Sequence, residues 1–208
     1  MPTTKTIRWV YKPVVHILCL LPLLHLMAGS TGFAGVSLGA DPIARLLHQL
    51  GAWGLRFLVI TLAVTPLRFM LSQPWLVSFR RMLGLYGFAY VLMHFIVWLT
   101  VDQGMYWPGI LKDIAKRPFI TLGFAALLLL IPLAITSTSK MMRRLGRRWQ
   151  KLHRLIYVIV PLGVWHFYWL VKKDVTEPLI YAAIVAFLLG YRYWRSRQRK
   201  QKAAMTAA

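Results

Sequence analysis

Residues 118–137 read PFITLGFAALLLLIPLAITS and contain no charged side chain. A segment of about 20 apolar residues is long enough to cross the roughly 30 Å hydrocarbon core of a bilayer as a helix. Five further apolar segments accompany it, at residues 13–33, 51–71, 82–101, 152–171 and 178–194. We therefore predict an all-α membrane protein, a six-helix transmembrane bundle.

Composition supports a membrane protein. Of the 208 residues, 58% are hydrophobic and only 15% are charged, whereas a soluble domain has about 25% charged residues. No internal repeat is evident, so residues 1–208 are predicted to form a single transmembrane domain. A basic tail, residues 195–208, follows the last span.

The basic residues predict the orientation of the bundle. The net charge is +21, and 19 of the 26 lysines and arginines fall on one side of the predicted membrane. All five acidic residues fall on the other side: Asp41, Asp102, Asp113, Asp174 and Glu177. By the positive-inside rule, the basic side and both termini are cytoplasmic. Topology and the headgroups of anionic membrane lipids account for the charge, so nucleic acid is not expected as a partner.

Cysteine usage limits the possible cofactors. Cys19 is the only cysteine, which excludes an intrachain disulfide, a cysteine-ligated iron–sulfur cluster and a C-x-x-C-H heme attachment site. No small-x-small cleavage site follows the first apolar segment, so we predict that this span is retained. Any metal cofactor must be held by histidines.

Five histidines are predicted to lie in spans or at their ends: His16, His25, His94, His153 and His166. A sixth, His48, falls in an outer loop, where a solvated surface role is favoured. Ionisable residues inside a membrane are costly and indicate function. Because the spans contain almost no carboxylate, a proton relay or a hydrolytic metal site is disfavoured. A neutral imidazole is a good axial ligand for heme iron and needs no counter-charge.

Position along the helices suggests how the histidines pair. His94 and His166 both lie in the outward halves of their spans, at similar depth, where they could face each other across one porphyrin. His153 precedes His166 by 13 residues, or roughly 20 Å along a helix, which would place two irons in the two leaflets. Thirteen residues do not bring two side chains to one face of an ideal helix, although Pro161 could change the winding. Histidines that simply pack between helices remain an alternative.

Four stretches resemble one known family. They are Arg80–Leu85 (RRMLGL) leading to Tyr90 and His94, residues 145–154 (LGRRWQKLHR) leading to His166, residues 39–42 (GADP) and residues 117–123 (RPFITLG). Together they extend over nearly the whole chain. They resemble the MsrQ family, formerly YedZ. Its members are the heme-binding membrane subunits of periplasmic protein-methionine-sulfoxide reductase systems, and are related to the transmembrane domains of ferric reductases and NADPH oxidases.

The resemblance implies a bacterial inner-membrane protein with intramembrane heme b, in one or two copies, and FMN. Such a protein takes electrons from the quinone pool or from a cytosolic flavin reductase. It passes them to a periplasmic molybdopterin reductase, MsrP, with which it forms a heterodimer that repairs oxidised methionine. The family's iron ligands correspond to His94, His153 and His166. Catalysis then belongs to the partner, because this chain has no G-x-G-x-x-G dinucleotide unit.

At one position the chain departs from the pattern of the NADPH oxidases. A second histidine expected near position 80 is Arg80, so an inner heme needs another ligand, for which His16 has the best depth. His25 is deeper and is expected to be packed or hydrogen bonded. Arg56 lies close in depth to His94 and His166, and could pair with a heme propionate. It could equally be an arginine that extends to the membrane interface.

Two other classes of function remain open. A ferric reductase-like or cytochrome b561-like quinone oxidoreductase would use the same heme chemistry. A small transporter or a structural membrane protein would be a different class, but transporters usually show charged or broken helices at midplane. The deep parts of these spans are nearly free of charge.

Overall fold

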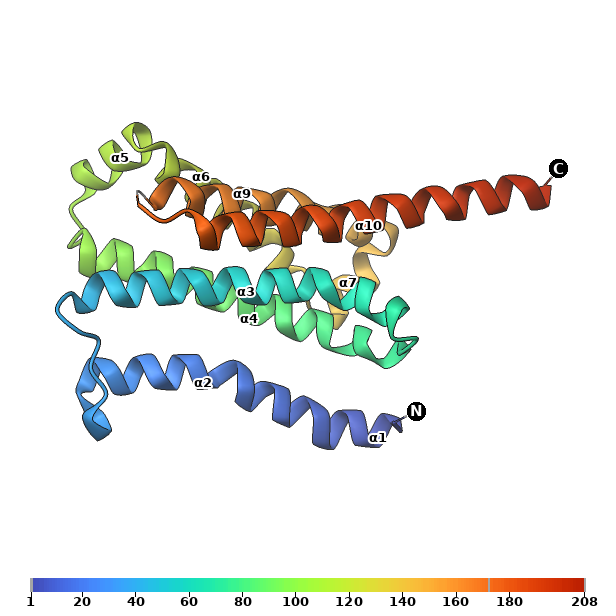
Figure 1. Cartoon of the computed structure of the whole chain (residues 1–208), viewed down its shortest axis with the longest axis horizontal. Coiled ribbons are helices and arrows are strands. Elements are labelled where there is room, and N and C mark those ends of the chain that lie inside the picture. The colour runs from blue at the N-terminus through green and yellow to red at the C-terminus, as the bar shows by residue number, and fades with distance from the viewer. Residues whose placement is uncertain (1, 172, 208) are drawn as a thin grey trace.

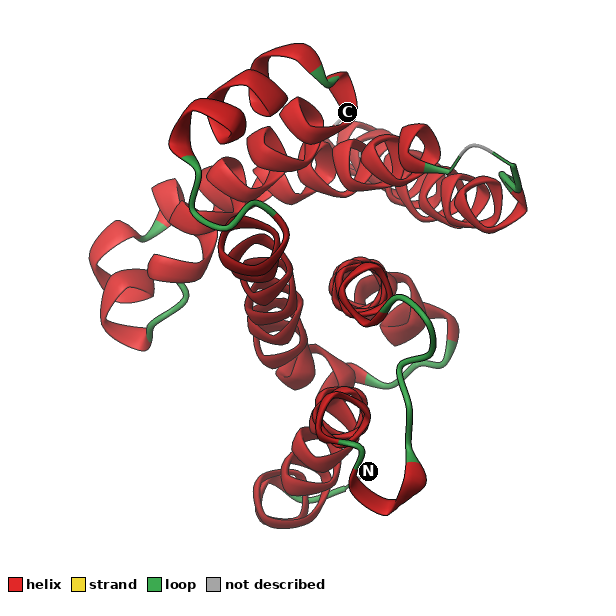
Figure 2. Ribbon diagram, turned by 90° about the vertical axis from the view of Figure 1, so that its left-hand side faces the viewer, coloured by secondary structure: helices red, strands yellow, loops and turns green. Residues whose placement is uncertain are grey.

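The computed structural model describes residues 2–171 and 173–207, and shows helices joined by short loops (Figures 1 and 2). No strand occurs in this part of the chain, which confirms the all-α class. The α-helices are α1 (Thr4–Thr6), α2 (Lys12–Thr31), α3 (Pro42–Met70), α4 (Arg80–Val97), α5 (Trp107–Lys116), α6 (Pro118–Ile135), α7 (Ser139–Leu145), α8 (Arg147–Leu152), α9 (Ile156–Leu170) and α10 (Thr176–Ala207). Two π-helical turns, Ile7–Tyr11 and Trp98–Asp102, and three 3₁₀ turns, Phe33–Gly35, Pro74–Phe79 and His153–Leu155, complete them.

Within the described residues, four continuous helical segments are long and apolar enough to cross a bilayer. They are Thr4–Thr31, Pro42–Met70, Pro74–Asp102 and Pro118–Ile135, and they match the first four predicted spans. The fifth and sixth spans are not confirmed by this measure. Helix α9 has 15 residues, and α10 continues from an apolar first half into the basic residues 195–207. The predicted basic tail is therefore a helical extension of the last predicted span.

Helix α3 begins nine residues before the predicted span of residues 51–71, and the reason is local. The Asp41 side chain accepts a hydrogen bond from the Ala44 backbone N–H at 3.0 Å, and Pro42 occupies the first helical position. Both are strong signals for a helix N-terminus. Upstream, α2 ends at Gly32, whose φ of +70° is the left-handed conformation that glycine adopts without strain.

Helix α3 is the centre of the bundle. One face of it joins a core with α6, α9 and α10 through Leu55, Leu58 and Leu62. The opposite face joins a second core with α2 and α4 through residues such as Leu50 and Phe57. In Figure 1, α2 lies at one edge of the bundle and both termini lie at the same end, together with α7. The structure thus gathers the basic segments and the two termini at one end.

A proline inside α3 is compensated by an arginine from α10. Pro66 has no N–H, so the carbonyl of Leu62, four residues earlier, lacks its usual helical donor. The Arg192 guanidinium donates to this carbonyl and also to the Tyr157 hydroxyl, at 3.0 Å for the latter. The contact joins α3, α9 and α10 near the end of the bundle that carries the termini.

The kinked helix α2 is held by the hydroxyl of Tyr90, a side chain of α4 that is 1% exposed. This hydroxyl donates to the Cys19 carbonyl at 2.8 Å and accepts from the Leu23 N–H at 3.0 Å. In a regular helix these two backbone groups would bond each other. The tyrosine is therefore inserted into the backbone ladder beside Pro22, where side-chain insertion is a known cause of bending.

We expect Tyr90→Phe to destabilise the protein by about 1–2 kcal/mol, because it removes two hydrogen bonds of a buried group. Thermal unfolding of the detergent-purified protein, followed by circular dichroism, measures the effect. Tyr168→Phe is the matched control, since Tyr168 is 41% exposed and makes no hydrogen bond within the described residues. Equal midpoints for the two variants would contradict the proposed role of the hydroxyl.

Candidate functional site

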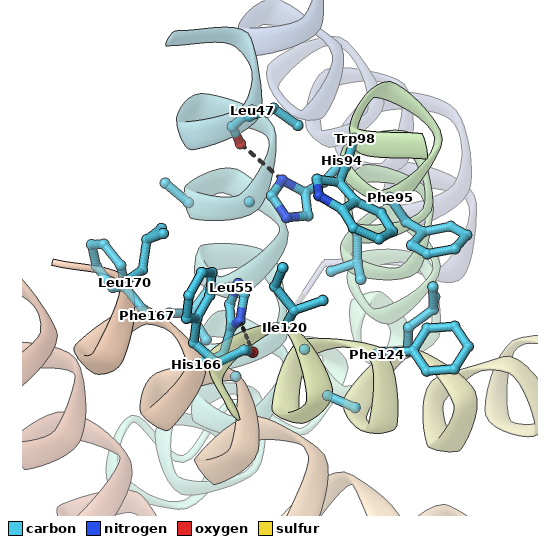
Figure 3. A pocket seen from close by; sticks show the side chains of 18 of the residues that line it. Leu47, Leu55, His94, Phe95, Trp98, Ile120, Phe124, His166, Phe167 and Leu170 are labelled. Carbon is cyan, nitrogen blue, oxygen red and sulfur yellow. Dashed lines mark hydrogen bonds between the residues drawn. The ribbon is translucent and has the colours of Figure 1, made fainter. Parts of the chain in front are cut away.

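A cavity of about 500 Å³ lies between α3, α4, α6 and α9. Most of its wall is apolar, with leucine and phenylalanine side chains from all four helices (Figure 3). Two imidazoles reach into it: His94 from α4 and His166 from α9. The sequence had placed these histidines at similar depth on separate spans, and the structure brings them together.

Each imidazole is oriented by a backbone carbonyl. Nδ1 of His94 lies 2.9 Å from the Leu47 carbonyl oxygen, and Nδ1 of His166 lies 2.6 Å from that of Phe119 (Figure 3). A carbonyl only accepts, so each Nδ1 carries the proton and each Nε2 keeps its lone pair. A hydrogen bond from one ring nitrogen to a backbone carbonyl is the contact that fixes the tautomer of a metal-ligating histidine.

The distance between the two rings suits one shared metal atom. Their centroids are 6.2 Å apart and their planes are inclined at 78°. An imidazole nitrogen binds a metal at about 2.0–2.1 Å, so two such bonds plus the two ring radii give a separation of about 6 Å. Two neutral imidazoles in an apolar cavity of this volume therefore fit a bis-histidine heme, which needs no charged protein ligand.

A glycine gives each imidazole access to its carbonyl. In a helix, the residue four positions after a carbonyl projects its Cβ over the same face. Here that residue is Gly51 for Leu47 and Gly123 for Phe119. A Cβ on Gly51 would lie 3.2 Å from Nδ1 of His94, and one on Gly123 would lie 2.8 Å from Nδ1 of His166. A larger residue at position 123 would force His166 to shift, and one at position 51 would crowd His94.

The two halves of the site repeat each other along the chain. Each histidine hydrogen bond spans 47 residues, and the second set lies 72 positions after the first, from 94 to 166 and from 51 to 123. The same offset relates further residues of the cavity wall: Leu55 to Leu127, Leu58 to Leu130 and Phe95 to Phe167. The two halves of the site therefore correspond by position, although no internal repeat is evident in the sequence. The equivalent positions are few and widely spaced, so only their meeting at one cavity reveals them.

His48 was assigned to an outer loop, and this is also wrong. It lies on α3, lines the cavity, and its ring centroid is 5.7 Å from that of Phe167. The side chain is still exposed, at the mouth of the cavity. The signal that could have placed it is the N-terminal pair Asp41–Pro42, which starts α3 before position 48.

Polar residues near the mouth include Asp102 and Arg117, which also line the cavity. The Arg117 guanidinium pairs with Asp113 at 3.2 Å and its side chain is 56% exposed. Sequence reasoning had not considered Arg117 as a partner for an anionic group. Its place just before Pro118, at the first turn of α6, was the available signal.

The Arg56 side chain contacts residues outside the large cavity. Its guanidinium donates to the Tyr181 hydroxyl at 2.9 Å, pairs with Glu177 at 3.2 Å, and lies 4.8 Å above the Trp53 ring. It lines a second, smaller cavity together with His25. In this structure the Arg56 guanidinium is thus paired with a carboxylate of α10, and its pairing with a heme propionate stays a prediction.

His153 and Arg80 lie near the opposite end of the bundle from the His94–His166 pair. Nε2 of His153 is 3.0 Å from the Thr136 hydroxyl, and its ring stacks on Trp149 with centroids 4.0 Å apart. Arg80 is close enough to interact electrostatically with His153. His153 stands in a 3₁₀ turn before α9, so it does not share one regular helix with His166.

His16, the predicted fourth ligand, is not paired with His153. It belongs to α2, and its Nδ1 is 2.8 Å from the Tyr86 hydroxyl of α4. His25 was expected to be packed or hydrogen bonded, yet its side chain is exposed and makes no hydrogen bond within the described residues. All six histidines lie in the described part of the chain. Among them, His94 and His166 are the only two whose rings contact each other.

The comparisons with known proteins agree with the geometry. Residues 50–164 match the family model described as "Ferric reductase like transmembrane component". A protein of Xanthomonas oryzae pv. oryzae is 48% identical over 100% of this chain and 97% of its own length. Relatives from Xanthomonas campestris pv. campestris (52% identical, 83% and 79% covered) and Caulobacter vibrioides (47% identical, 92% and 90% covered) are similar. All three are named "Protein-methionine-sulfoxide reductase heme-binding subunit MsrQ". No solved structure matches the chain.

We expect Gly123→Ala to destabilise the protein by about 1–3 kcal/mol, the usual cost of an overpacked contact, because the new Cβ would meet His166 at 2.8 Å. Gly51→Ala, with its contact at 3.2 Å, should have a smaller effect. The measurement is the unfolding midpoint of the purified protein. Gly190→Ala is the control: nothing lies within 4 Å of a Cβ there, and alanine favours the helix. The role of the glycines is disproved if Gly123→Ala and Gly190→Ala behave alike.

Proposed function

Because the chain belongs to the MsrQ family of heme-binding subunits, within the ferric reductase-like transmembrane proteins, we propose that it carries electrons across a bacterial inner membrane through b-type heme. The electrons come from the quinone pool or from a cytosolic flavin reductase. They go to a periplasmic molybdopterin reductase, MsrP, which repairs oxidised methionine in periplasmic proteins. Reduction of the sulfoxide takes place on the partner, and this chain supplies the electrons.

The observation that carries this proposal is the pair His94 and His166. Both imidazoles present a free Nε2 to an apolar cavity, held by the Leu47 and Phe119 carbonyls. A heme bound there would supply one-electron chemistry. His94 and His166 would hold it, and the apolar wall would limit the access of water, which tunes the potential of such a centre.

The topology follows from the charge and the helices. We propose that α9 and α10 complete a six-span bundle, since they pack in one core with α3 and α6. The end that carries both termini and the basic residues would face the cytoplasm. The His94–His166 pair then lies in the periplasmic half, on the side where the proposed acceptor is found.

The cytoplasmic half offers less support for a second heme. His153 has its Nε2 on Thr136, and His16 bonds Tyr86 on another helix. A heme ligated by His153 would require that the Thr136 contact break and that a further ligand approach. Our proposal therefore rests on one bis-histidine heme, and a second heme at His153 and the binding of FMN stay predictions.

Substitution of the histidines tests the heme site. His94→Ala and His166→Ala should each remove the same low-spin b-type absorbance from the dithionite-reduced protein, because either change leaves one axial ligand. His153→Ala should leave most of that absorbance. The measurement is the reduced-minus-oxidised spectrum of purified protein, with circular dichroism as the control for folding. Equal losses in all three folded variants would contradict the assignment of the pair.

The partner is tested by reoxidation. Protein in oriented vesicles is reduced from the cytoplasmic side, and MsrP with methionine sulfoxide is added outside. We expect the Soret band to return to its oxidised position faster with MsrP than without it, and His166→Ala to abolish the transfer. Stopped-flow absorbance gives the rates. If MsrP does not accelerate reoxidation, the partner is wrong, and a ferric reductase-like or cytochrome b561-like quinone oxidoreductase becomes the better assignment.

A further inference from the structure

A second cavity of about 270 Å³ lies between α2, the α2–α3 connection and α3. Its wall combines polar and apolar side chains: His25, Leu26, Ser37, Leu38, Arg45, Gln49, Trp53 and Arg56. Ser37 and Arg45 are exposed and stand at the end of the bundle where α2 and α3 are connected. The cavity therefore extends from the proposed periplasmic surface into the outer leaflet.

The absence of a partner for His25 among the described residues is the feature of this cavity that indicates a ligand. It lies six residues before the end of α2, so it is about 9 Å inside that end at 1.5 Å per residue. At this depth a polar side chain without a partner is costly and indicates function. No hydrogen bond, ion pair or ring contact joins His25 to any other described residue. Its imidazole is free both to donate and to accept a hydrogen bond.

The other polar groups differ in how far they are already satisfied. Arg56 is neutralised by Glu177, bonds Tyr181, and lies on the Trp53 ring. Arg45 has only a long 3.5 Å contact with the Leu38 carbonyl. The Gln49 amide makes no hydrogen bond within the described residues. The cavity thus offers free donors and acceptors next to an indole and two leucines, which suits a flat, oxygen-bearing ring better than a compact anion.

The two cavities lie back to back on α3. Gln49 and Trp53 line the small cavity, whereas their neighbours His48 and Ala52 line the large one. Both pairs are therefore at the same height along the helix. An α-helix with its side chains is about 10–12 Å across, so one helix separates the two spaces. An electron that passes from the small cavity to the large one therefore crosses the width of one helix.

We propose that the small cavity binds the head group of a membrane quinol and is where that donor is oxidised. This proposal rests on the proposed function, because it supplies the electrons for the His94–His166 centre. Gln49 and His25 hydrogen bond the two oxygens of the ring, and Trp53 packs on its face.

Oxidation of the quinol to the quinone releases two electrons and two protons. A single centre held by His94 and His166 would take one electron at a time, so it would have to pass the first to the acceptor before it took the second, and two such transfers complete one quinol. His25 accepts the proton of the hydroxyl that it binds and passes it to water at the mouth beside Ser37 and Arg45, and the hydroxyl bound by Gln49 gives its proton to that water directly. The protons therefore leave on the periplasmic side.

Fluorescence quenching tests the site directly and does not depend on electron transfer. The full-length protein is placed in phosphatidylcholine nanodiscs and titrated with decylubiquinone, which quenches indole fluorescence on contact. We expect saturable quenching whose amplitude falls in Trp53→Phe but not in Trp169→Phe, the control on α9. His25→Ala and Gln49→Ala should each weaken binding about fivefold to tenfold, as expected for the loss of one hydrogen bond.

A kinetic measurement complements the binding. Reduction of the heme by decylubiquinol should slow in His25→Ala, while reduction by dithionite and the reduced spectrum remain unchanged. Quenching that is the same in Trp53→Phe as in the unaltered protein would overturn the proposal. So would competition by inorganic phosphate or by phosphatidylglycerol, which would assign the cavity to an oxyanion or a lipid headgroup. A protein that binds the quinone at Trp53 but shows no b-type spectrum would sink the proposed function and leave the site intact.

Discussion

Inside a bilayer a polar group finds no water, so each one must be satisfied by another part of the protein. This condition explains contacts that otherwise look unrelated. The carbonyl of Leu62, deprived of a donor by Pro66, takes one from Arg192. The backbone groups of Cys19 and Leu23 are bridged by the Tyr90 hydroxyl. The contacts hold α10 and α2, respectively, against α3 and α4, so the same hydrogen bonds that satisfy the backbone also position the helices.

The imidazoles of the large cavity obey the same condition. A carbonyl already engaged in a helix has a second lone pair, and the Leu47 and Phe119 carbonyls use it to accept from Nδ1 of His94 and His166. Each ring is thereby fixed in one tautomer, with Nε2 toward the cavity. The requirement that polar groups be satisfied thus leaves two imidazole lone pairs facing the cavity without any charged residue. It also accounts for the glycines, since only a residue without Cβ lets the ring approach a carbonyl inside a helix.

The large cavity is built from two halves whose residues correspond at an offset of 72 positions. Helices α3 and α4 form one half and α6 and α9 the other, and each half contributes one histidine, one carbonyl and one glycine. Neither half is a site alone. Helix α2 lies outside this arrangement and carries His25, which has no partner in the described residues. The other histidine of α2, His16, is bonded to Tyr86 of α4, so His25 alone of the two is left without a partner among the described residues.

Some of this was predictable, and particular residues show why. The apolar run from Pro118 predicts α6 because its length matches the bilayer, and the depth of His94 and His166 predicts that they can meet. The start of α3 was misplaced because hydropathy averages over a window and overlooks the cap at Asp41. That error put His48 in a loop. The expectation that His25 would be packed or hydrogen bonded also failed, because the depth of a residue does not specify the neighbours of its side chain.

The sequence by itself determined that the chain is helical, that its long apolar segments suit a membrane, and that histidine rather than cysteine is the residue available to hold a metal cofactor. These properties follow from composition and from length along one helix. Tertiary structure decided which histidines meet, which carbonyls orient them, that Arg56 pairs with Glu177, and that two cavities share α3. Such facts depend on the rotation of each helix about its axis and on contacts between residues far apart in the chain, and periodicity within one segment does not specify them.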